Sequence, residues 1–238
     1  MSSRIEEKEK RKAERLAAQR KAEQAAARRR RLQIIGGALV ALGIVVAVAI
    51  ALSSGGGSSS GLNANSPVSQ DIQGIKLPAP KITNLKQAAA AAGCSLHTYA
   101  PEGRAHVPGP VNYKTNPPTS GNHDQTPAAD GVYASANTPA KEHFVHTLEH
   151  GRIEYQYKAG TPLTAIKQLE ALWNEPVMGS PGYKQLLFQN NTNMPYAVAA
   201  VAWTQVIGCP AFNDKIFDAF RDFRTAYIDK GPEQIAPT

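Results

Sequence analysis

Residues 139–158 read PAKEHFVHTLEHGRIEYQYK, and this stretch predicts a helix followed directly by a β-strand. Thr138 and Pro139 favour a helix start, with threonine as the N-cap and proline in the first helical position. Gly151 predicts the end of that helix, because glycine readily adopts the left-handed backbone conformation that follows helix C-termini. From Arg152 to Lys158 apolar and polar residues alternate, which is typical of a strand with one buried face.

Other helices and strands are expected on both sides of this stretch. Leu85–Ala92 predicts a short helix that ends at Gly93. The remaining patterns predict a short strand at 132–133, a helix over 162–173, strands at 185–188 and 196–206, and an amphipathic helix over 213–227. Together they indicate an α+β domain in which two to three helices cover a small mixed or antiparallel sheet of four or five strands.

The first 52 residues have a different composition. Residues 1–31 contain 12 of the 26 Lys and Arg residues but only 5 of the 19 acidic residues. They predict a basic, solvated helix that resembles a coiled coil in its charges but lacks the apolar a and d positions. Residues 34–52 are uncharged and apolar, and as a helix they would span about 28 Å, close to the thickness of a bilayer core. We therefore expect residues 32–52 to be a transmembrane signal-anchor.

The order of these segments predicts the topology. Because the basic residues precede the apolar run and no Lys or Arg follows it until Lys76, we expect the N-terminus in the cytoplasm and the rest of the chain outside. The lengths of the basic and apolar regions favour an uncleaved anchor over a cleavable signal peptide. Residues 53–81 are rich in Gly, Ser and Pro and predict a flexible linker to a globular domain at 82–238.

The distribution of charge also bears on partners. The residues after 31 contain 14 basic and 14 acidic residues, so the net charge of +7 belongs to the tail at 1–31. A basic cluster beside a membrane helix attracts anionic lipid. We expect the tail to contact lipid, and we expect no nucleic-acid partner.

Histidine is distributed unevenly along the chain. Histidine is a frequent ligand of zinc and copper, so a cluster indicates a candidate metal site, although each histidine taken alone could be an ordinary loop or core residue. In the predicted helix His146 and His150 lie one turn apart, and a separate loop would supply His123. Glu149 lies about 100° around the helix from His150, so we expect it to support the ligands rather than to bind the ion. All six histidines fall between residues 97 and 150: His97, His106, His123, His143, His146 and His150.

The segment from His146 to His150 also matches the pattern H-x-x-E-H. In one class of zinc peptidases the two histidines of this pattern bind zinc and the glutamate activates a water molecule. That interpretation makes Glu149 a candidate catalytic residue. The peptidase arrangement requires a long helix and a downstream acidic ligand, whereas Gly151 and a strand follow here.

The chain has two cysteines, Cys94 and Cys209. Both follow the apolar segment, so under the expected topology they would lie in an oxidising compartment and could form a disulfide. The residues alone leave two buried free thiols as the alternative.

Several short motifs suggest a family. N-P-P-T-S-G-N-H at 116–123 and V-H-T-L-E-H-G-R at 145–152 are the most specific, and with His106 and the two cysteines they extend from about 94 to 232. In these motifs the domain resembles the bacterial family called domain of unknown function 3105, although Asn122 and Asp124 depart from it. The resemblance implies a bacterial cell membrane location and a bridge between Cys94 and Cys209, and it supplies no activity. It also narrows the histidines to His106, His123, His146 and His150.

Three hypotheses follow for the function. The leading one is a membrane-tethered extracytoplasmic domain that binds zinc or copper through His123, His146 and His150, with His106 as a further ligand candidate. The second is a cell-envelope interaction module, in which the histidines only organise hydrogen bonds and the partner is an unknown envelope protein. The third is a zinc hydrolase that uses Glu149.

Overall fold

A computed structural model describes residues 72–233 of the chain. The expected basic tail, the membrane segment and most of the linker lie outside the described residues. Within 72–233 no helix is long and apolar enough to cross a bilayer.

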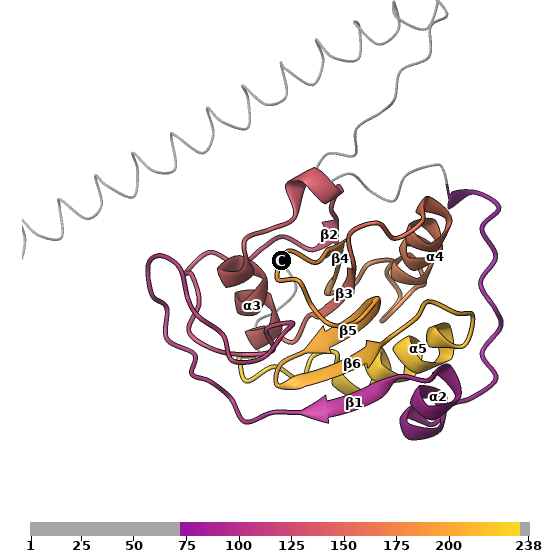
Figure 1. Cartoon of the computed structure of the whole chain (residues 1–238), viewed down its shortest axis with the longest axis horizontal. Helices are drawn as coiled ribbons and strands as arrows, with labels where there is room; N and C mark the ends of the chain where they lie inside the picture. The colour runs from indigo at the N-terminus through magenta and orange to yellow at the C-terminus, as the bar shows by residue number, and fades with distance from the viewer. Residues whose placement is uncertain (1–71, 234–238) are drawn as a thin grey trace, which may run out of the picture. The chain divides into compact units, whose positions relative to one another are not determined.

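The described residues form an α+β domain with a six-stranded mixed sheet and four α-helices (Figure 1). A short 3-10 helix at Ser135–Asn137 adds a turn before α3. The elements in chain order are α2 (Leu85–Ala92), β1 (Ser95–Thr98), β2 (Gly131–Val132), α3 (Lys141–Glu149), β3 (Ile153–Tyr157), α4 (Leu163–Trp173), β4 (Gln185–Gln189), β5 (Val198–Ala202), β6 (Gln205–Cys209) and α5 (Ile216–Tyr227).

The strands lie in the order β1-β6-β5-β3-β4-β2. The first four form antiparallel pairs, whereas β3, β4 and β2 run parallel. In this register Tyr155 of β3 lies opposite Ala200 of β5 on one side and Leu187 of β4 on the other. The sheet is therefore mixed, which was one of the two arrangements that the sequence predicted.

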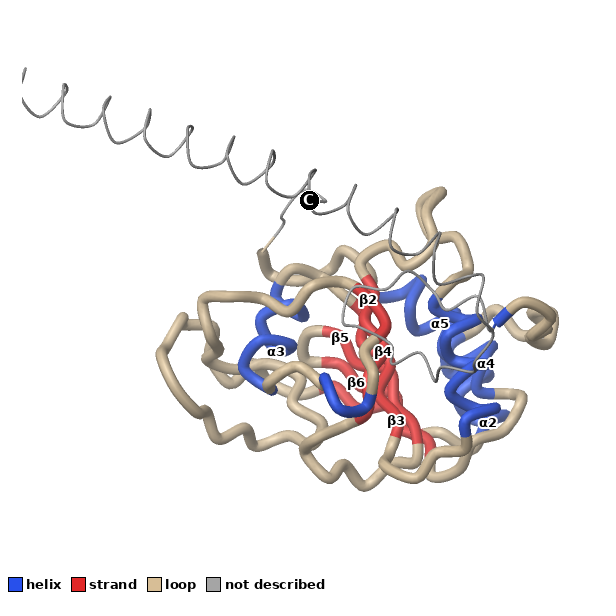
Figure 2. The backbone as a smooth tube through the Cα atoms, turned by 90° about the horizontal axis from the view of Figure 1, so that it is seen from above, coloured by secondary structure: helices blue, strands red, loops and turns tan. Residues whose placement is uncertain are grey.

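The helices divide unequally between the two faces of the sheet. Helices α2, α4 and α5 cover one face, and α3 lies on the other (Figure 2). The first face carries the largest apolar core, in which Tyr155, Leu169 and Phe220 are fully buried. The α3 face has two smaller clusters, one around Phe144 and Phe188 and one around Leu148. We call these two sides the apolar face and the α3 face.

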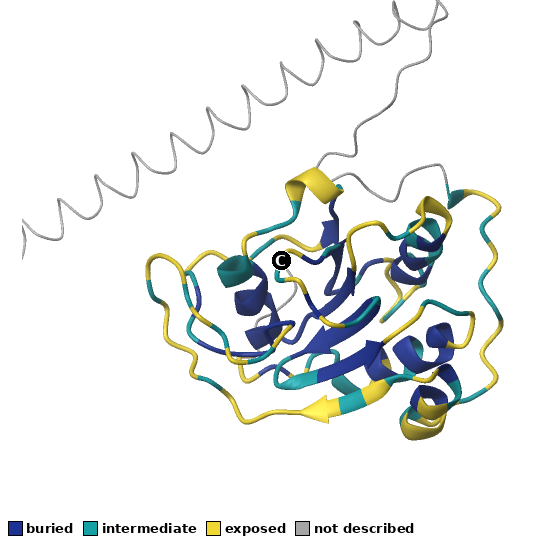
Figure 3. Ribbon diagram, viewed as in Figure 1, coloured by how far each residue is buried: buried dark blue, intermediate teal, exposed yellow. Residues whose placement is uncertain are grey.

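Strand β3 is buried on both faces, and the expectation of a half-buried strand was wrong. All five of its residues are buried, because β4 and β5 flank it and helices cover both sides (Figure 3). Ile153, Tyr155 and Tyr157 pack into the apolar face. Glu154 and Gln156, which the alternation placed towards solvent, have no exposed surface.

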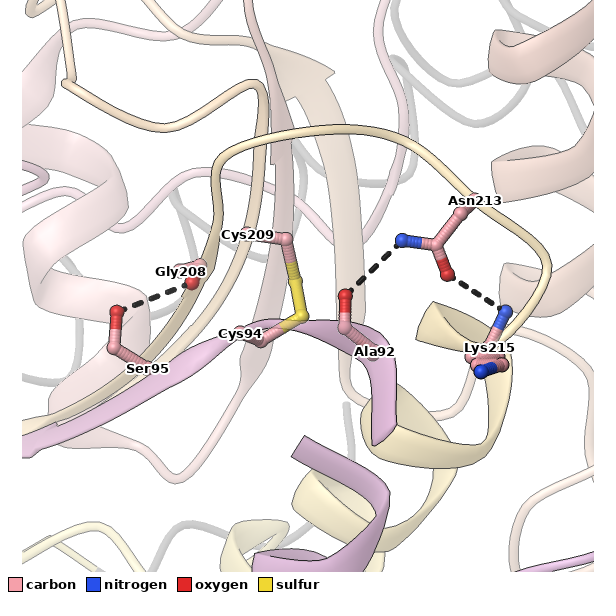
Figure 4. Close-up of a disulfide and its surroundings, with 7 residues drawn as sticks. All are labelled: Ala92, Cys94, Ser95, Gly208, Cys209, Asn213 and Lys215. Carbon is pink, nitrogen blue, oxygen red and sulfur yellow. Dashed lines mark hydrogen bonds between the residues drawn. A yellow bond between two sulfur atoms is a disulfide. The ribbon is translucent and has the colours of Figure 1, made fainter. Parts of the chain in front are cut away.

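The predicted disulfide between Cys94 and Cys209 is confirmed (Figure 4). Cys94 follows Gly93, the left-handed residue that ends α2, and Cys209 is the last residue of β6. The bridge therefore joins the first helix of the described domain to the sheet, across 115 residues of sequence. Near it, the Asn213 side chain donates a hydrogen bond to the carbonyl of Ala92, at 3.0 Å.

Several local predictions differ from the structure. The region 196–206 is not one strand but β5 and the start of β6, joined by a turn in which Thr204 has a φ of 62°. The edge strand β1 was not expected, and the sheet has six strands rather than four or five. The four α-helices match the four helical segments predicted, one more than the two to three expected to cover the sheet. Helix α3 is capped by Ala140 rather than Thr138, because the Thr138 hydroxyl donates instead to the carbonyl of Gln189, at 2.9 Å. The end of α3 before Gly151, with a φ of 76°, is as predicted.

Candidate metal centre

Helix α3 carries the densest group of polar side chains in the domain. Phe144 and Leu148 face the sheet, and both are fully buried. His146, Glu149 and His150 are also buried, with exposed fractions of 3%, 4% and 6%. Burying polar side chains costs free energy unless they have partners, so these residues must be matched by groups on the segment that covers the helix.

That covering segment is the long loop between β1 and β2, which supplies His106 and His123. The two histidines form an isolated parallel bridge. The backbone N–H of His123 donates to the Ala105 carbonyl at 3.1 Å, and the N–H of Val107 donates to the His123 carbonyl at 2.9 Å. The loop is also attached to α3, since Glu142 accepts a hydrogen bond from the backbone N–H of Val111, at 2.8 Å. Two distant parts of the loop are thus held against one helix.

The motif around Gly121 explains how the loop reaches the helix. Gly121 has a φ of 136°, and a Cβ at this position would lie 2.8 Å from the ring of Tyr113. Only glycine therefore allows the chain to pass under this ring. The Tyr113 hydroxyl then donates to the carbonyl of Asn122, at 2.8 Å, which fixes the residue just before His123.

The two buried histidines His123 and His146 are held in the same way. Nδ1 of His123 lies 2.7 Å from the carbonyl of Gly121, and Nδ1 of His146 lies 2.7 Å from the carbonyl of Asp124. A carbonyl can only accept a hydrogen bond, so each Nδ1 must carry the proton. Each Nε2 then carries a lone pair, which is the tautomer of a histidine that binds a metal through Nε2. At His146 this nitrogen also lies within hydrogen-bond distance of Nε2 of His150, at 2.9 Å.

The donor atoms of these two histidines and of two neighbouring residues lie close together. One donor atom from each of His106, His123, His146 and Glu149 lies within 4.8 Å of all the others. Nε2 of His123 lies 3.0 Å from Oε2 of Glu149, yet this buried nitrogen has no aligned hydrogen-bond partner. An imidazole lone pair and a carboxylate oxygen repel each other unless a proton or a metal ion lies between them. The donor set and its orphaned nitrogen therefore fit a metal ion.

His150 belongs to a second group on the same helix. Its Nε2 lies 2.9 Å from Nε2 of His146 and 3.3 Å from Oε2 of Glu233. One donor atom from each of His146, His150 and Glu233 lies within 4.8 Å of the other two. The contact between His146 and His150 across one helical turn agrees with the spacing in the sequence. Glu233 comes from the segment after α5, and no motif pointed to it.

The position of Glu149 differs from the geometric expectation. Its carboxylate lies among the nitrogens of three histidines, whereas it was expected to support the ligands from behind. The reason is the position of His123, whose ring contacts the carboxylate of Glu149 at 3.0 Å. Residues spaced i,i+3 are neighbours on a helix surface. His146 and Glu149 have this spacing, so they face His123 together.

Burial keeps the two helix histidines neutral. It lowers the pKa of His146 to about 4, although the hydrogen bond with the Asp124 carbonyl acts in the opposite direction. Burial also lowers the pKa of His150, the guanidinium of Arg152 adds to this shift, and Glu233 opposes it. Both imidazoles are therefore neutral at neutral pH, which is the form that binds metal ions.

The other two histidines lie outside both groups. His97 is exposed on the edge strand β1, where its ring stacks on Tyr99 with a centroid separation of 6.0 Å. Nδ1 of His143 lies 2.7 Å from the carbonyl of Thr126, and the residue belongs to neither donor group. The family resemblance set these two residues apart from the other four in the same way.

A buried polar network lies between α3 and the sheet. The Thr147 hydroxyl is 2.6 Å from the carbonyl of Phe144 and 3.1 Å from Oε1 of Glu154. The Thr147 hydroxyl can donate to either of these acceptors. Burial raises the pKa of Glu154 well above its usual range, because a charged carboxylate is costly in the interior. Gln156 completes the network by donating to Oε2 of Glu154, at 2.8 Å.

The fold and site define an α+β domain whose helix and covering loop enclose a cluster of histidines and a glutamate. Residues 106–238 match the family described as protein of unknown function, DUF3105, and the chain belongs to this family. The matched region includes every residue of both donor groups and begins after Cys94. No curated protein and no solved structure matches the chain.

Proposed function

We propose that this domain binds one transition metal ion, zinc or copper, through His106, His123, His146 and Glu149. The observation that carries the proposal is the pair of buried imidazoles whose Nδ1 atoms are fixed on backbone carbonyls, with Nε2 of His123 3.0 Å from Oε2 of Glu149 and without an aligned hydrogen-bond partner. Metal-binding histidines usually have a partner of this kind on the other ring nitrogen. A hydrogen-bonding network without an ion would need a proton between Nε2 of His123 and the carboxylate of Glu149.

The donor set indicates the kind of ion. Three imidazole nitrogens and one carboxylate oxygen suit Zn²⁺ and Cu²⁺, whereas the harder ions Mg²⁺ and Ca²⁺ prefer oxygen ligands. Four protein ligands complete a tetrahedral zinc site, while catalytic zinc sites usually have three and an open position. With Glu149 as a ligand, the H-x-x-E-H pattern also lacks a free carboxylate to act as a base. We therefore favour metal binding over the zinc hydrolase.

Calorimetric titration tests the proposal. The full chain is purified in detergent without a His tag, stripped with a chelator and titrated with Zn²⁺ and with Cu²⁺. We expect saturable binding by the wild-type chain and an affinity lower by at least about 100-fold in His146→Ala, because a direct ligand is lost. The matched control is His97→Ala, which removes an exposed histidine outside both groups and should bind like wild type.

Two results would contradict metal binding. One is the absence of saturable binding tighter than about 10 μM in the wild-type chain. The other is unchanged binding when His123 and His146 are both replaced by alanine. Either result would favour an envelope interaction module, in which the histidines serve only the hydrogen bonds of the covering loop.

We also propose that the chain is anchored in the bacterial membrane by residues 32–52, with the basic tail at 1–31 in the cytoplasm in contact with anionic lipid. The 12 basic residues before the apolar run support this orientation. A reporter enzyme that is active only outside the cytoplasm should work when it is fused after Thr238. Activity of a cytoplasm-only reporter at the same position would show that the orientation is reversed.

A further inference from the structure

The candidate ligands form two groups that share one residue. We call His106, His123, His146 and Glu149 the inner group, and His146, His150 and Glu233 the outer group. Because Nδ1 of His146 is bonded to the carbonyl of Asp124, only its Nε2 is left to bind an ion. One imidazole nitrogen has one lone pair, so His146 can serve one group at a time. The two groups are therefore alternative positions for a single ion.

The outer group has the spacing of ligands around one ion. Metal–nitrogen bonds of 2.0–2.1 Å place neighbouring ligand atoms about 3 Å apart. Nε2 of His150 is 2.9 Å from Nε2 of His146 and 3.3 Å from Oε2 of Glu233. An ion bound at either position would remain bonded to His146, so it could pass between the groups without being released.

The two groups differ in donors and in access to solvent. The inner group has four donors, of which only His106 is exposed, whereas the outer group has three and ends in Glu233, whose side chain is 47% exposed. Affinity rises with the number and rigidity of ligands, so we expect the inner position to be the tighter one. A half-exposed carboxylate can reach a hydrated cation and attract it.

The position of Glu233 is fixed by backbone contacts with α3. Its N–H donates to the carbonyl of Glu149 at 3.0 Å, and the N–H of Asp229 donates to the carbonyl of Gly151 at 2.9 Å. A Cβ at Gly231 would lie 2.1 Å from the carbonyl oxygen of Glu149. The segment after α5 therefore lies directly against the end of the helix that carries the ligands, and glycine at 231 permits this contact.

We propose that the outer group of His146, His150 and Glu233 is the position through which the metal ion reaches and leaves the inner group. This inference rests on the proposed function, because it requires that the inner group binds an ion. It assigns Glu233 a kinetic role: the carboxylate captures the hydrated cation, and His146 then transfers the ion to the inner ligands.

A role on the path predicts a specific kinetic result. A group that only lowers the barrier for binding lowers it equally for release, so its removal slows both steps and leaves the equilibrium constant unchanged. An ordinary ligand behaves differently, because its loss weakens affinity mainly through faster release. Measuring both rates and the equilibrium constant separates the two roles.

The experiment compares the full-length wild-type chain with Glu233→Gln, which keeps the backbone contacts of the segment. Trp203 is a natural reporter, since its ring lies 6.4 Å from that of His123 and Cu²⁺ quenches tryptophan fluorescence. Stopped-flow mixing with Cu²⁺ measures loading, and mixing of the loaded chain with excess EDTA measures release. We expect Glu233→Gln to slow both rates by about tenfold, because the carboxylate that bonds the ion between solvent and the inner group is lost, and to leave Kd nearly unchanged. Asp214→Asn, which removes an exposed carboxylate in the loop before α5, is the matched control and should behave like wild type.

Two sets of outcomes would overturn the inference. Normal loading and release in Glu233→Gln would show that the outer group is not on the path. Faster release with weaker binding would show that Glu233 is an ordinary ligand. In both cases binding by the wild-type chain leaves the proposed function standing, whereas no binding by the wild-type chain overturns the proposed function and this inference together.

Discussion

The two faces of the sheet bury different kinds of side chain, although the same strands form both. On the apolar face, Tyr155 of β3 packs against Phe220 of α5, with ring centroids 5.8 Å apart. On the α3 face, the next residue back along β3 is Glu154, fully buried and bonded to Thr147. The apolar face can thus stabilise the fold through burial alone. The α3 face places polar groups in the interior, where each needs a specific partner, and this difference locates the candidate site.

The disulfide is expected to make the largest single contribution to the stability of the apolar face. Replacing Cys94 and Cys209 with alanine removes a bridge that closes a loop of 115 residues. The chain-entropy model gives a loss of about 4–5 kcal/mol in the free energy of unfolding, as an upper value. Chemical denaturation of the double variant measures this loss. Thiol titration of the unreduced, denatured wild-type chain should find no free thiol, and two free thiols would remove the basis of the prediction.

Phe220→Ala should destabilise the apolar face without changing metal binding on the α3 face. Phe220 is fully buried in the large core, and truncation of such a residue costs about 3–5 kcal/mol. Under conditions where the variant is still folded, its affinity for Zn²⁺ should equal that of the wild-type chain. Denaturation and calorimetry on the same sample measure both quantities. A parallel loss of affinity would mean that the two faces are not independent.

Glu149→Gln should have the opposite effect to Phe220→Ala: it should lower the affinity for zinc and leave the stability of the apo protein nearly unchanged. The variant keeps the shape of the side chain but removes the charge, so the apo protein should be about as stable as wild type. At a zinc concentration of 100 times Kd the ion should stabilise the wild-type chain by about 2.7 kcal/mol. A tenfold to 100-fold loss of affinity would reduce this gain by about 1.3–2.3 kcal/mol in the variant. Thermal unfolding with and without zinc measures it, and an undiminished gain would return Glu149 to a supporting role.

Glu154→Gln tests the polar network of the α3 face through pH. Because the folded-state pKa of Glu154 is raised, its stabilising effect is complete below the unfolded value of about 4.3 and is lost as pH rises towards the folded pKa. Glutamine resembles the protonated form and does not titrate. The wild-type chain should therefore lose stability relative to the variant as the pH rises above about 5. Chemical denaturation across this range measures the difference, and equal changes in both chains would contradict a raised pKa of Glu154. Asp214→Asn is the control at an exposed carboxylate.

The sequence predicted those parts of the fold that depend on local signals. The helix ends at Gly93 and Gly151 and the amphipathic helix α5 follow from residue patterns of short range. The turn at Thr204 was missed because Ala-Trp-Thr-Gln contains no Gly, Pro or Asn to signal it. The burial of Glu154 was missed because alternation shows which residues share a face and cannot show that both faces are covered.

The sequence predicted most residues of the candidate site but not how they are arranged. The clustering of histidines and the family motifs selected His106, His123, His146 and His150, and the structure brings them together around α3. The division into two groups depends on where the covering loop crosses the helix, which is a tertiary feature. Glu233 lies 83 residues beyond His150 along the chain, and an exposed glutamate near the C-terminus has no signal that links it to a histidine cluster.

The central claim is that the α3 face holds a metal ion, and metal content tests it most directly. The full chain is expressed without a His tag, purified without chelators and analysed for transition metals by mass spectrometry, beside a variant in which His123 and His146 are alanine. The account predicts about one equivalent of zinc or copper per wild-type chain and close to none in the variant. A wild-type chain that contains no transition metal and takes up none from Zn²⁺ or Cu²⁺ solutions would contradict it.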